Sequence, residues 1–319
     1  MNVRSSAIYK PFLAGQYKVE SGISKLGRDF GNGPADALVF QFDSEFGRFR
    51  ENLAGARADD LGKYYGVTDA FQRVDQNVYS FIARRLAHEH PKEFRLDRTG
   101  AFVALHCELT GNTVEFTADF HFLRSSDSMH VSGLDALASQ IQEDLAVMVT
   151  DDVADRLVAL HVTAPSYWDP SEKLGHDFPT VHAPVPHIER VNEASRKQFA
   201  RIQTGGRFTR FAWGANAPDR LHRHPVKAAW FEGSQEDWDP PRFDAANPKL
   251  YVSIERQTLV GLENCTLFTI HPYFIEASIL APDEKQLLAA AIESMSPESR
   301  QYKSLALDCD AIVNWLRST

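Results

Sequence analysis

Alternation of polar and apolar residues in the second half of the chain is the feature that most restricts the fold. Three segments show it, with no long helical pattern between them: residues 207–214, 249–259 and 265–278. Two earlier alternating segments flank residues 110–112, Thr-Gly-Asn, which have the composition of a hairpin turn. Strands that follow one another without long helices between them favour antiparallel pairing. The sequence therefore predicts an α+β protein built on an antiparallel sheet.

Helical periodicity lies mainly towards the two ends of the chain. In residues 70–91 the apolar side chains form one stripe, and Pro91 marks the end of the helix. We expect further helices at residues 42–53, 134–149, 188–203, 283–295 and 308–316, and a strand at 156–165. Residues 1–319 are predicted to form a single domain with a mainly helical N-terminal part (1–95), a sheet core (100–280) and C-terminal helices (281–319).

Charge, cysteine content and hydropathy restrict the partners and the compartment. The 319 residues carry a formal net charge of -9, whereas nucleic acids and anionic membranes select basic surfaces. The N-terminus lacks the apolar run of a signal peptide, and no apolar stretch reaches membrane-spanning length. The three cysteines lie far apart without a C-x-x-C pair, which argues against a zinc ribbon or a cysteine-held iron–sulfur cluster. We expect a cytoplasmic protein whose main partner is neither nucleic acid nor membrane.

The common nucleotide-binding and hydrolase motifs are missing from the sequence. It contains no G-x-G-x-x-G, no P-loop, no G-x-S-x-G and no H-E-x-x-H. We therefore expect this chain to bind neither a nicotinamide nor a nucleoside triphosphate of its own.

The segment KLGHDFPTVHAPVPHIE, residues 173–189, combines three prolines with three histidines. Pro184 and Pro186 favour extended conformations at the residues before them, which would hold His182 in one direction. Such a histidine suits iron, zinc or proton transfer. The spacing alone favours the alternative, a structural histidine bonded to a backbone carbonyl.

Other histidines lie in less distinctive surroundings. His222 and His224 would share a face if they lay on a strand and could then bind metal, but in a loop they are more often solvated. His271, near the end of a predicted strand, is interpreted as a polar residue of an edge strand.

Two arginines lie on strand faces that otherwise look apolar. Arg210 shares its face with Phe208 and Ala212, and Arg256 shares its face with Ile254. A buried arginine needs an anionic partner, because an unpaired buried charge is costly. That partner is either a protein carboxylate or a bound anion such as a cofactor carboxylate, which arginine binds in bidentate fashion.

Several segments, in the same order and spacing, resemble the haem-dependent oxidative N-demethylase family. They are PFLAGQYKV, FQFDSEFGRFRENL, HPKEF, IQEDLAVMV, SYWDPSEKLGHDFPTVHAPVP, RFTRFAW and ERQTL followed by LFTI. The resemblance spans most of the chain. It departs at His271, where the pattern has a basic residue, and at Ala212, where it has Asn before Trp213.

The resemblance implies a PAS-like antiparallel sheet that cups a haem b. It implies O₂-dependent removal of a methyl group from a small secondary amine such as dimethylamine, with release of formaldehyde. It also implies separate partners: a flavin and iron–sulfur reductase subunit that draws electrons from NADPH, and a folate-binding subunit that accepts formaldehyde.

The resemblance also implies roles for single residues. His182 lies in the family-like motif and becomes the expected iron ligand, with His187, His222 and His271 as alternatives. We expect Lys173, Arg210 and Arg256 to contact the haem propionates. We expect Glu255 and Trp213 to contact a substrate ammonium, which favours carboxylates and aromatic faces.

Three further hypotheses stay open from the sequence. The chain could be a haem-PAS sensor or binding module without turnover, or a hydrolase with a metal held by His182, His222 and His224. The acidic segment 233–244 contains Trp238, which looks exposed. This segment is either a solvated loop or a docking surface for a basic reductase.

Overall fold

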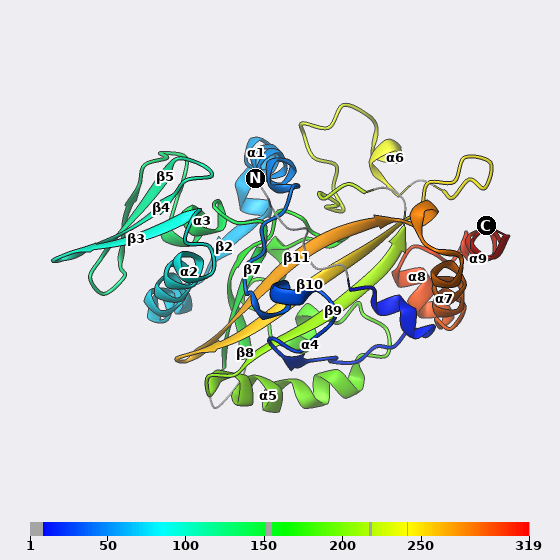
Figure 1. The fold of residues 1–319 in the computed structure, drawn as a ribbon, viewed down its shortest axis with the longest axis horizontal. Coiled ribbons are helices and arrows are strands. Elements are labelled where there is room, and N and C mark those ends of the chain that lie inside the picture. Colours follow the sequence, from blue (N-terminus) through cyan, green and yellow to red (C-terminus); the bar gives the residue numbers. More distant parts are fainter. Residues whose placement is uncertain (1–8, 151–154, 217–218, 241, 319) are drawn as a thin grey trace.

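The computed structural model describes residues 9–150, 155–216, 219–240 and 242–318, in which the strands form two sheets paired antiparallel throughout (Figure 1). The larger sheet has the order β1 (Ser24–Lys25), β9 (Arg207–Asn216), β10 (Tyr251–Leu262), β11 (Cys265–Glu276), β7 (Asp144–Thr150), β8 (Asp155–His161) and β2 (Tyr65–Val67). The smaller sheet consists of β3 (Phe94–Thr99), β4 (Phe102–Cys107), β5 (Asn112–Thr117) and β6 (Phe122–Ser125). The predicted α+β class with antiparallel sheets is confirmed.

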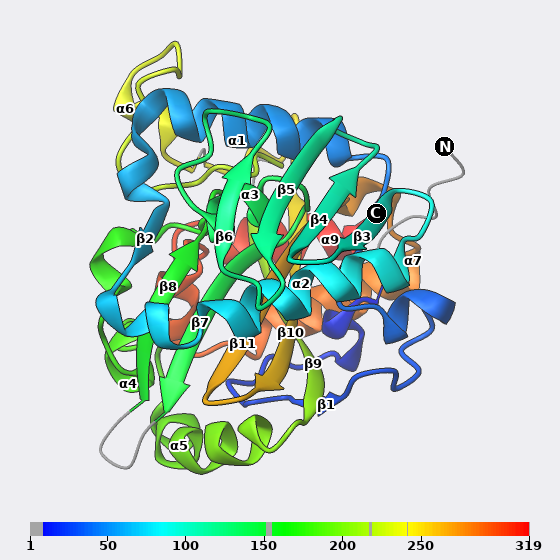
Figure 2. The same ribbon diagram turned by 90° about the vertical axis from the view of Figure 1, so that its left-hand side faces the viewer.

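Helices surround the larger sheet. They are α1 (Phe46–Asp60), α2 (Asp75–Glu89), α3 (Gly133–Ala138), α4 (Phe178–Val181), α5 (Glu189–Gln203), α6 (Gln235–Trp238), α7 (Pro282–Glu293), α8 (Pro297–Tyr302) and α9 (Cys309–Ser318). In Figure 1, α5 runs below the larger sheet and α7, α8 and α9 gather at its right-hand end. Figure 2 shows α2 and the smaller sheet in front of the larger one.

The central strands and α5 form as their patterns predict, and the hairpin between β4 and β5 is confirmed. The β10–β11 hairpin closes with two residues, and Asn264 adopts the left-handed conformation, with φ of 62°, that Asn tolerates better than most residues. The helix predicted at residues 134–149 is wrong in its second half. Helix α3 ends at Ala138, and Asp144–Thr150 is strand β7. A short apolar run has no clear period, so helix and strand are hard to distinguish there.

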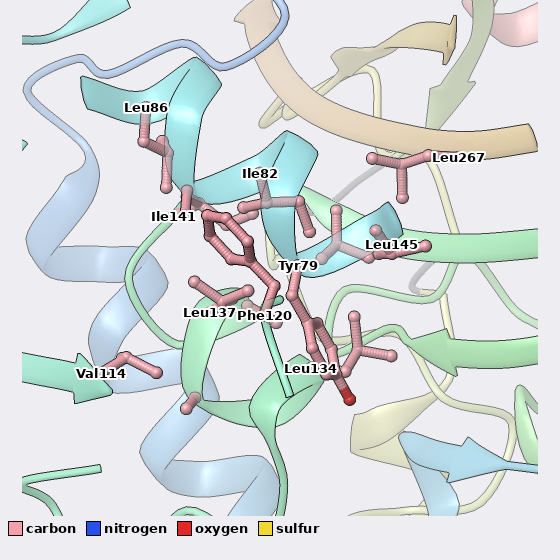
Figure 3. Close-up of a cluster of buried hydrophobic side chains, with 14 of the residues drawn as sticks. Tyr79, Ile82, Leu86, Val114, Phe120, Leu134, Leu137, Ile141, Leu145 and Leu267 are labelled. Atoms are coloured by element: carbon pink, nitrogen blue, oxygen red, sulfur yellow. The ribbon is translucent and has the colours of Figure 1, made fainter. Parts of the chain in front are cut away.

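One large hydrophobic core lies between α2, α3, the smaller sheet and one side of the larger sheet. Figure 3 shows the packing of Tyr79, Ile82 and Leu86 from α2 against Leu134 and Leu137 from α3, with Leu145 and Leu267 coming from the larger sheet. Complete burial of a Leu or Ile side chain contributes about 1.5–3 kcal/mol. This side of the larger sheet is therefore closed to solvent by packing.

Within the described ranges, the structure contains no helix with the length and apolarity that crossing a membrane requires. The likeness to a PAS fold stays a prediction, as does the division into helical part, sheet core and C-terminal helices. The larger sheet nevertheless takes β1 and β2 from the first hundred residues, so the N-terminal part contributes strands as well as helices.

Candidate functional site

The two faces of the larger sheet differ in exposure where β9, β10 and β11 lie side by side. Along β10, Ile254, Arg256 and Thr258 are buried, whereas Glu255 and Gln257 between them are partly exposed. Residues paired across neighbouring strands point to the same face, so the register assigns residues of β9 and β11 to the buried or to the partly exposed face of β10. We call the first set the closed face, comprising Trp213, Ile254, Arg256, Thr258, His271 and Tyr273. The second is the open face, comprising Arg210, Ala212, Glu255, Gln257, Ile270 and Phe274.

Glu255 lies near the centre of the open face. Its neighbours across the sheet are Ala212 on β9 and Pro272 on β11, neither of which has a polar side chain. The hydrogen bond recorded for its carboxylate comes from Nε2 of Gln257, at 2.9 Å. The carboxylate of Glu255 therefore has no polar side chain directly opposite it on either neighbouring strand.

Cationic side chains surround Glu255 at a distance. The positive charges of Arg210, Arg223 and Lys303 all interact with it electrostatically, which raises their pKa values against the lowering by burial. Among the described residues, neither Arg210 nor Lys303 forms an ion pair within 4 Å. Arg210 and Gly214, which Lys303 approaches, are four residues apart on β9, about 13 Å along a strand. Arg210 and Lys303 therefore approach Glu255 from opposite sides of Ala212, its cross-strand partner on β9.

The carboxylate of Asp144 on β7 points to the same face of the sheet as that of Glu255. Its cross-strand partner is Ile270 of the open face, and its oxygens accept hydrogen bonds from the backbone N–H of Thr163 (2.7 Å) and of Ala164 (3.1 Å). Burial raises the pKa of Asp144 to about 7, although these N–H groups oppose the shift, and the charge of Glu255 adds to it. Near neutral pH this group can hold a proton beside Glu255.

His182 lies at the end of α4, one turn after Phe178. Its Nδ1 is 3.0 Å from the carbonyl oxygen of Phe178, and the two rings stack with centroids 4.0 Å apart. Burial lowers the pKa of His182 to about 4, the Phe178 carbonyl opposes this, and the charges of Arg210 and Lys173 add to it. The imidazole is therefore neutral at physiological pH, and among the described residues no protein group bonds its Nε2.

The backbone around His182 differs from the expected extended frame. The N–H of Val185 donates to the carbonyl of His182 at 2.9 Å, so the chain turns immediately after the histidine. Asp177 caps α4 by accepting from the N–H of Thr180. The direction of the ring is fixed by the helix and by the Phe178 carbonyl, and the prolines that follow form part of a turn.

An apolar pocket lies between α5 and the open face, beside Phe178. Helix α5 can approach closely because Gly261 has no Cβ, which would otherwise lie 1.7 Å from the carbonyl oxygen of Ile202. The pocket combines aromatic and aliphatic walls with the side chain of one arginine, and its lining includes Phe178, Phe199, Ile202, Arg210, Leu259 and Phe268. The Nε of Arg210 is buried there and has no hydrogen-bond partner in the described part of the chain.

Arg256 and Trp213, predicted to belong to the site, lie on the opposite side of the sheet. Arg256 pairs with Phe211 and is 1% exposed, whereas Arg210 pairs with Gln257. Nη2 of Arg256 donates to the carbonyl of Leu38 at 2.6 Å. The expectation that Arg210 and Arg256 lie near one another and face the same anion is wrong.

Trp213 pairs with Ile254 and packs on Phe12 and Tyr17, with ring centroids 5.9 and 5.8 Å apart. Its side chain therefore points away from the face that carries Glu255. The register excludes a site shared by Trp213 and Glu255.

His271 is also on the closed face, in the middle of the sheet and fully buried. The interpretation of His271 as an edge-strand residue is wrong. Its Nδ1 is 3.1 Å from Oε1 of Glu143 and its Nε2 is 3.6 Å from Oδ2 of Asp43. Burial would lower the pKa of His271, but the two carboxylates outweigh it and raise the pKa to about 9. A charged histidine held in this way is structural.

The remaining candidate histidines have other partners. His187 is exposed, and its Nε2 lies 2.9 Å from Oγ of Ser296. Nε2 of His222 lies 2.7 Å from the hydroxyl of Tyr64, and His224 pairs with Asp169 at 3.4 Å. No group of three or more His, Cys, Asp or Glu side chains within the described ranges is arranged to hold a metal ion. The hydrolase hypothesis therefore gains no support.

The structure corrects the interpretation of the acidic segment 233–244. Trp238 is 2% exposed, packed in an aromatic cluster with Phe231 and stacked under Arg220, whose Cζ is 3.9 Å from its ring centroid. Glu236 and Asp237 are exposed, and Asp237 belongs to the N-terminal cap of α6.

Arg223, Lys303 and Asp144 were not predicted from the sequence, because their positions depend on how loops return to the sheet. A usable signal existed for Arg223. It alternates with two histidines in Leu-His-Arg-His-Pro, and alternation of this kind directs the middle residue away from its neighbours.

Comparison with known families gives one match. The family model described as haem-dependent oxidative N-demethylase, alpha subunit-like, matches residues 36–313. The curated proteins contain no match to this sequence.

Proposed function

Because the chain belongs to the haem-dependent oxidative N-demethylase alpha-subunit-like family, we propose that it is the haem-binding oxygenase subunit of an oxidative N-demethylase. The proposed substrate is a small secondary amine such as dimethylamine, and formaldehyde is the released product. The observation that carries the proposal is His182, a neutral, oriented imidazole whose Nε2 is left for a ligand beside an apolar pocket and two cations.

His182 has the chemistry of an iron ligand. A metal-bound histidine normally donates its other ring N–H to a carbonyl or carboxylate, which fixes the tautomer and the ring direction. The Phe178 carbonyl is positioned to accept that hydrogen bond from Nδ1. The lowered pKa adds support, because only a neutral imidazole can bind a metal.

The side chains near His182 have the chemistry that a haem b needs from its surroundings. Arg210 and Lys173 both affect the pKa of His182, so they lie close enough to serve the propionates, and the unbonded Nε of Arg210 is a donor without a protein acceptor. Phe199, Leu259 and Phe268 would provide an apolar wall. Arg256 is not part of this assignment.

Haem, when bound, would supply the O₂-dependent oxidation of the N-methyl C–H bond. The reaction consumes O₂, two electrons and two protons, and places one oxygen atom in formaldehyde and the other in water. We assign Glu255 to hold the substrate ammonium and Asp144 Oδ2 to hold a proton near it.

The electrons come, in this proposal, from NADPH through a separate reductase subunit with flavin and an iron–sulfur cluster. A folate-binding subunit is the proposed acceptor of formaldehyde, and the cytoplasm the proposed location.

The test compares His182→Ala with His187→Ala, an exposed histidine in the same segment. We expect His182→Ala to lose haem or shift the Soret band sharply, and His187→Ala to keep the wild-type spectrum. An unchanged His182→Ala spectrum with full haem content would contradict the assignment. Amine-dependent formaldehyde release, driven by dithionite or by NADPH and the reductase, tests the activity. Haem binding without formaldehyde release would instead favour a haem sensor or binding module.

A further inference from the structure

The segment Leu221–Pro225 fixes Arg223 by holding the residues on either side of it. Nε2 of His222 contacts the hydroxyl of Tyr64, and this hydroxyl donates to Asp59 at 2.8 Å. On the other side, the indole N–H of Trp238 donates to the carbonyl of His224 at 2.7 Å. The His222 side chain and the His224 backbone are thus both anchored, which fixes the chain on either side of Arg223.

Arg223 is directed over the open face. Its guanidinium lies 5.4 Å from the ring centroids of both Phe274, on that face, and Tyr167. Its backbone carbonyl accepts from the N–H of Tyr167 at 2.8 Å. The negative charge of Glu255 raises its pKa against the effect of burial. The arginine is therefore buried, oriented and within electrostatic range of Glu255.

Lys303 approaches Glu255 from the connection after α8. A Cβ on Gly214 would lie 3.5 Å from Cδ and 3.9 Å from Nζ of Lys303, so the ammonium lies on the open face. Among the described residues, no hydrogen bond is made by this Nζ. Burial lowers the pKa of Lys303, the charge of Glu255 opposes this, and Arg223 and Arg210 add to the lowering.

Arg223 and Lys303 differ in position from the cations near His182. The charges that lower the pKa of His182 are those of Arg210 and Lys173. Glu255 interacts with Arg210 as well as with Arg223 and Lys303. Arg223 and Lys303 are nevertheless placed apart by the sheet register, because Phe274 under Arg223 and Gly214 beside Lys303 both pair with Ser253. One end of the open face thus presents a carboxylate next to two oriented cations, an arrangement complementary to a small zwitterion.

We propose that Arg223 and Lys303 bind a carboxylate of the substrate while Glu255 binds its ammonium, so that the preferred substrate is an N-methyl amino acid. The inference rests on the proposed demethylase function and narrows its substrate class. For N-methylglycine, one O₂, two electrons from the reduced nicotinamide and two protons give glycine, formaldehyde and water. The N–CH₃ bond is broken, and a new N–H bond on the amine nitrogen takes its place.

The test measures binding of N-methylglycine, N-methylglycinamide and dimethylamine to the haem-loaded protein by isothermal titration calorimetry without reductant. We expect N-methylglycine to bind about 10- to 100-fold more tightly than its amide, the usual effect of hydrogen bonds to a charged group. Lys303→Gln should remove most of this preference, and Arg223→Gln should do the same if it folds. The exposed Lys197→Gln on α5 is the matched control and should keep it.

Two outcomes would overturn the assignment. Equal affinities for N-methylglycine and its amide would show that the carboxylate is not recognised. Loss of haem from Lys303→Gln with unchanged ligand preference would show that this lysine serves the cofactor. A wild-type protein that binds no haem would instead contradict the proposed function, and the same calorimetry on that protein would still decide whether the carboxylate is recognised.

Discussion

The two faces of the larger sheet hold charged groups in opposite ways. On the closed face, His271 lies between Glu143 and Asp43, and Arg256 donates to the backbone near Leu38. On the open face, Glu255 and Lys303 interact electrostatically without forming an ion pair among the described residues. Buried charges that have partners hold a fold together, whereas charges held apart around a space are arranged for a ligand.

The closed face therefore predicts stability effects and the open face predicts ligand effects. Substitutions matched between the two faces test this distinction, because each should change one property and leave the other unaltered.

The largest loss of stability is expected from His271→Ala. Removal of the imidazolium leaves Glu143 and Asp43 buried next to one another, and breaking a buried ion pair costs about 3–5 kcal/mol. Gln257→Ala on the open face removes a partly exposed amide and should cost less than about 1 kcal/mol. Urea unfolding of both variants measures the difference. Equal losses would remove the distinction between the faces.

The same histidine predicts a pH dependence. The pKa of His271 is raised to about 9 in the folded chain against about 6.5 when unfolded, so its contribution is complete below pH 6.5 and is lost as pH rises through 9. We expect roughly 3 kcal/mol of stability to be lost between pH 6.5 and 9.5. Urea unfolding at several pH values should show this in wild type and in His187→Gln, and much less in His271→Gln. A wild-type curve as flat as that of His271→Gln would contradict the assignment.

Two arginines on neighbouring strands provide a matched pair of substitutions. Arg256→Met should lower stability by about 1–3 kcal/mol, because the Leu38 carbonyl loses its donor and nearby acidic groups lose a compensating positive charge, and should leave haem retention unchanged. Arg210→Met should change stability little and weaken haem retention by about 1–3 kcal/mol. Haem transfer to apomyoglobin and urea unfolding measure the two effects. The reverse result would place the cofactor on the closed face.

This pair also shows what the sequence can and cannot predict. Alternation correctly places Arg210 with Ala212, and Arg256 with Ile254, on one face of each strand. It does not say which face of β9 lies beside which face of β10. A shift of one residue in register exchanges the faces. Only the register in the structure therefore shows that Arg210 and Arg256 lie on opposite faces, and that Glu255 and Trp213 do too.

The candidate site was predictable where its signals are local. His182 stood out because of its segment, and α4 is short enough for Phe178 and His182 to interact within one turn. Arg223 and Lys303 reach the open face from segments distant in sequence, through contacts with Tyr167 and Gly214. Tertiary contacts of this kind leave little trace in composition or periodicity.

The smallest effect is expected outside both faces, on the exposed side of α6. Trp238 is buried there, so a docking surface would consist of acidic side chains alone, of which Glu236 is exposed and takes no part in capping α6. Electrostatic steering raises the association rate and weakens with salt. If the reductase docks at this segment, reductase-driven turnover should fall several-fold from about 0.01 to 0.15 M ionic strength, as the Debye length decreases from roughly 30 to 8 Å. Dithionite-driven turnover should change much less.

Charge reversal at Glu236 should reproduce the salt effect at low ionic strength, while reversal at Glu193 on α5 provides an exposed acidic control. Neither variant should alter urea stability or the Soret band, because these side chains lie outside the core and outside the open face. That combination separates docking from the functions of the sheet: a closed-face substitution lowers stability, an open-face substitution lowers ligand binding, and a docking substitution lowers only the reductase-driven rate. If that rate is independent of salt and unaffected by the reversal, the segment is solvated surface and the reductase docks elsewhere.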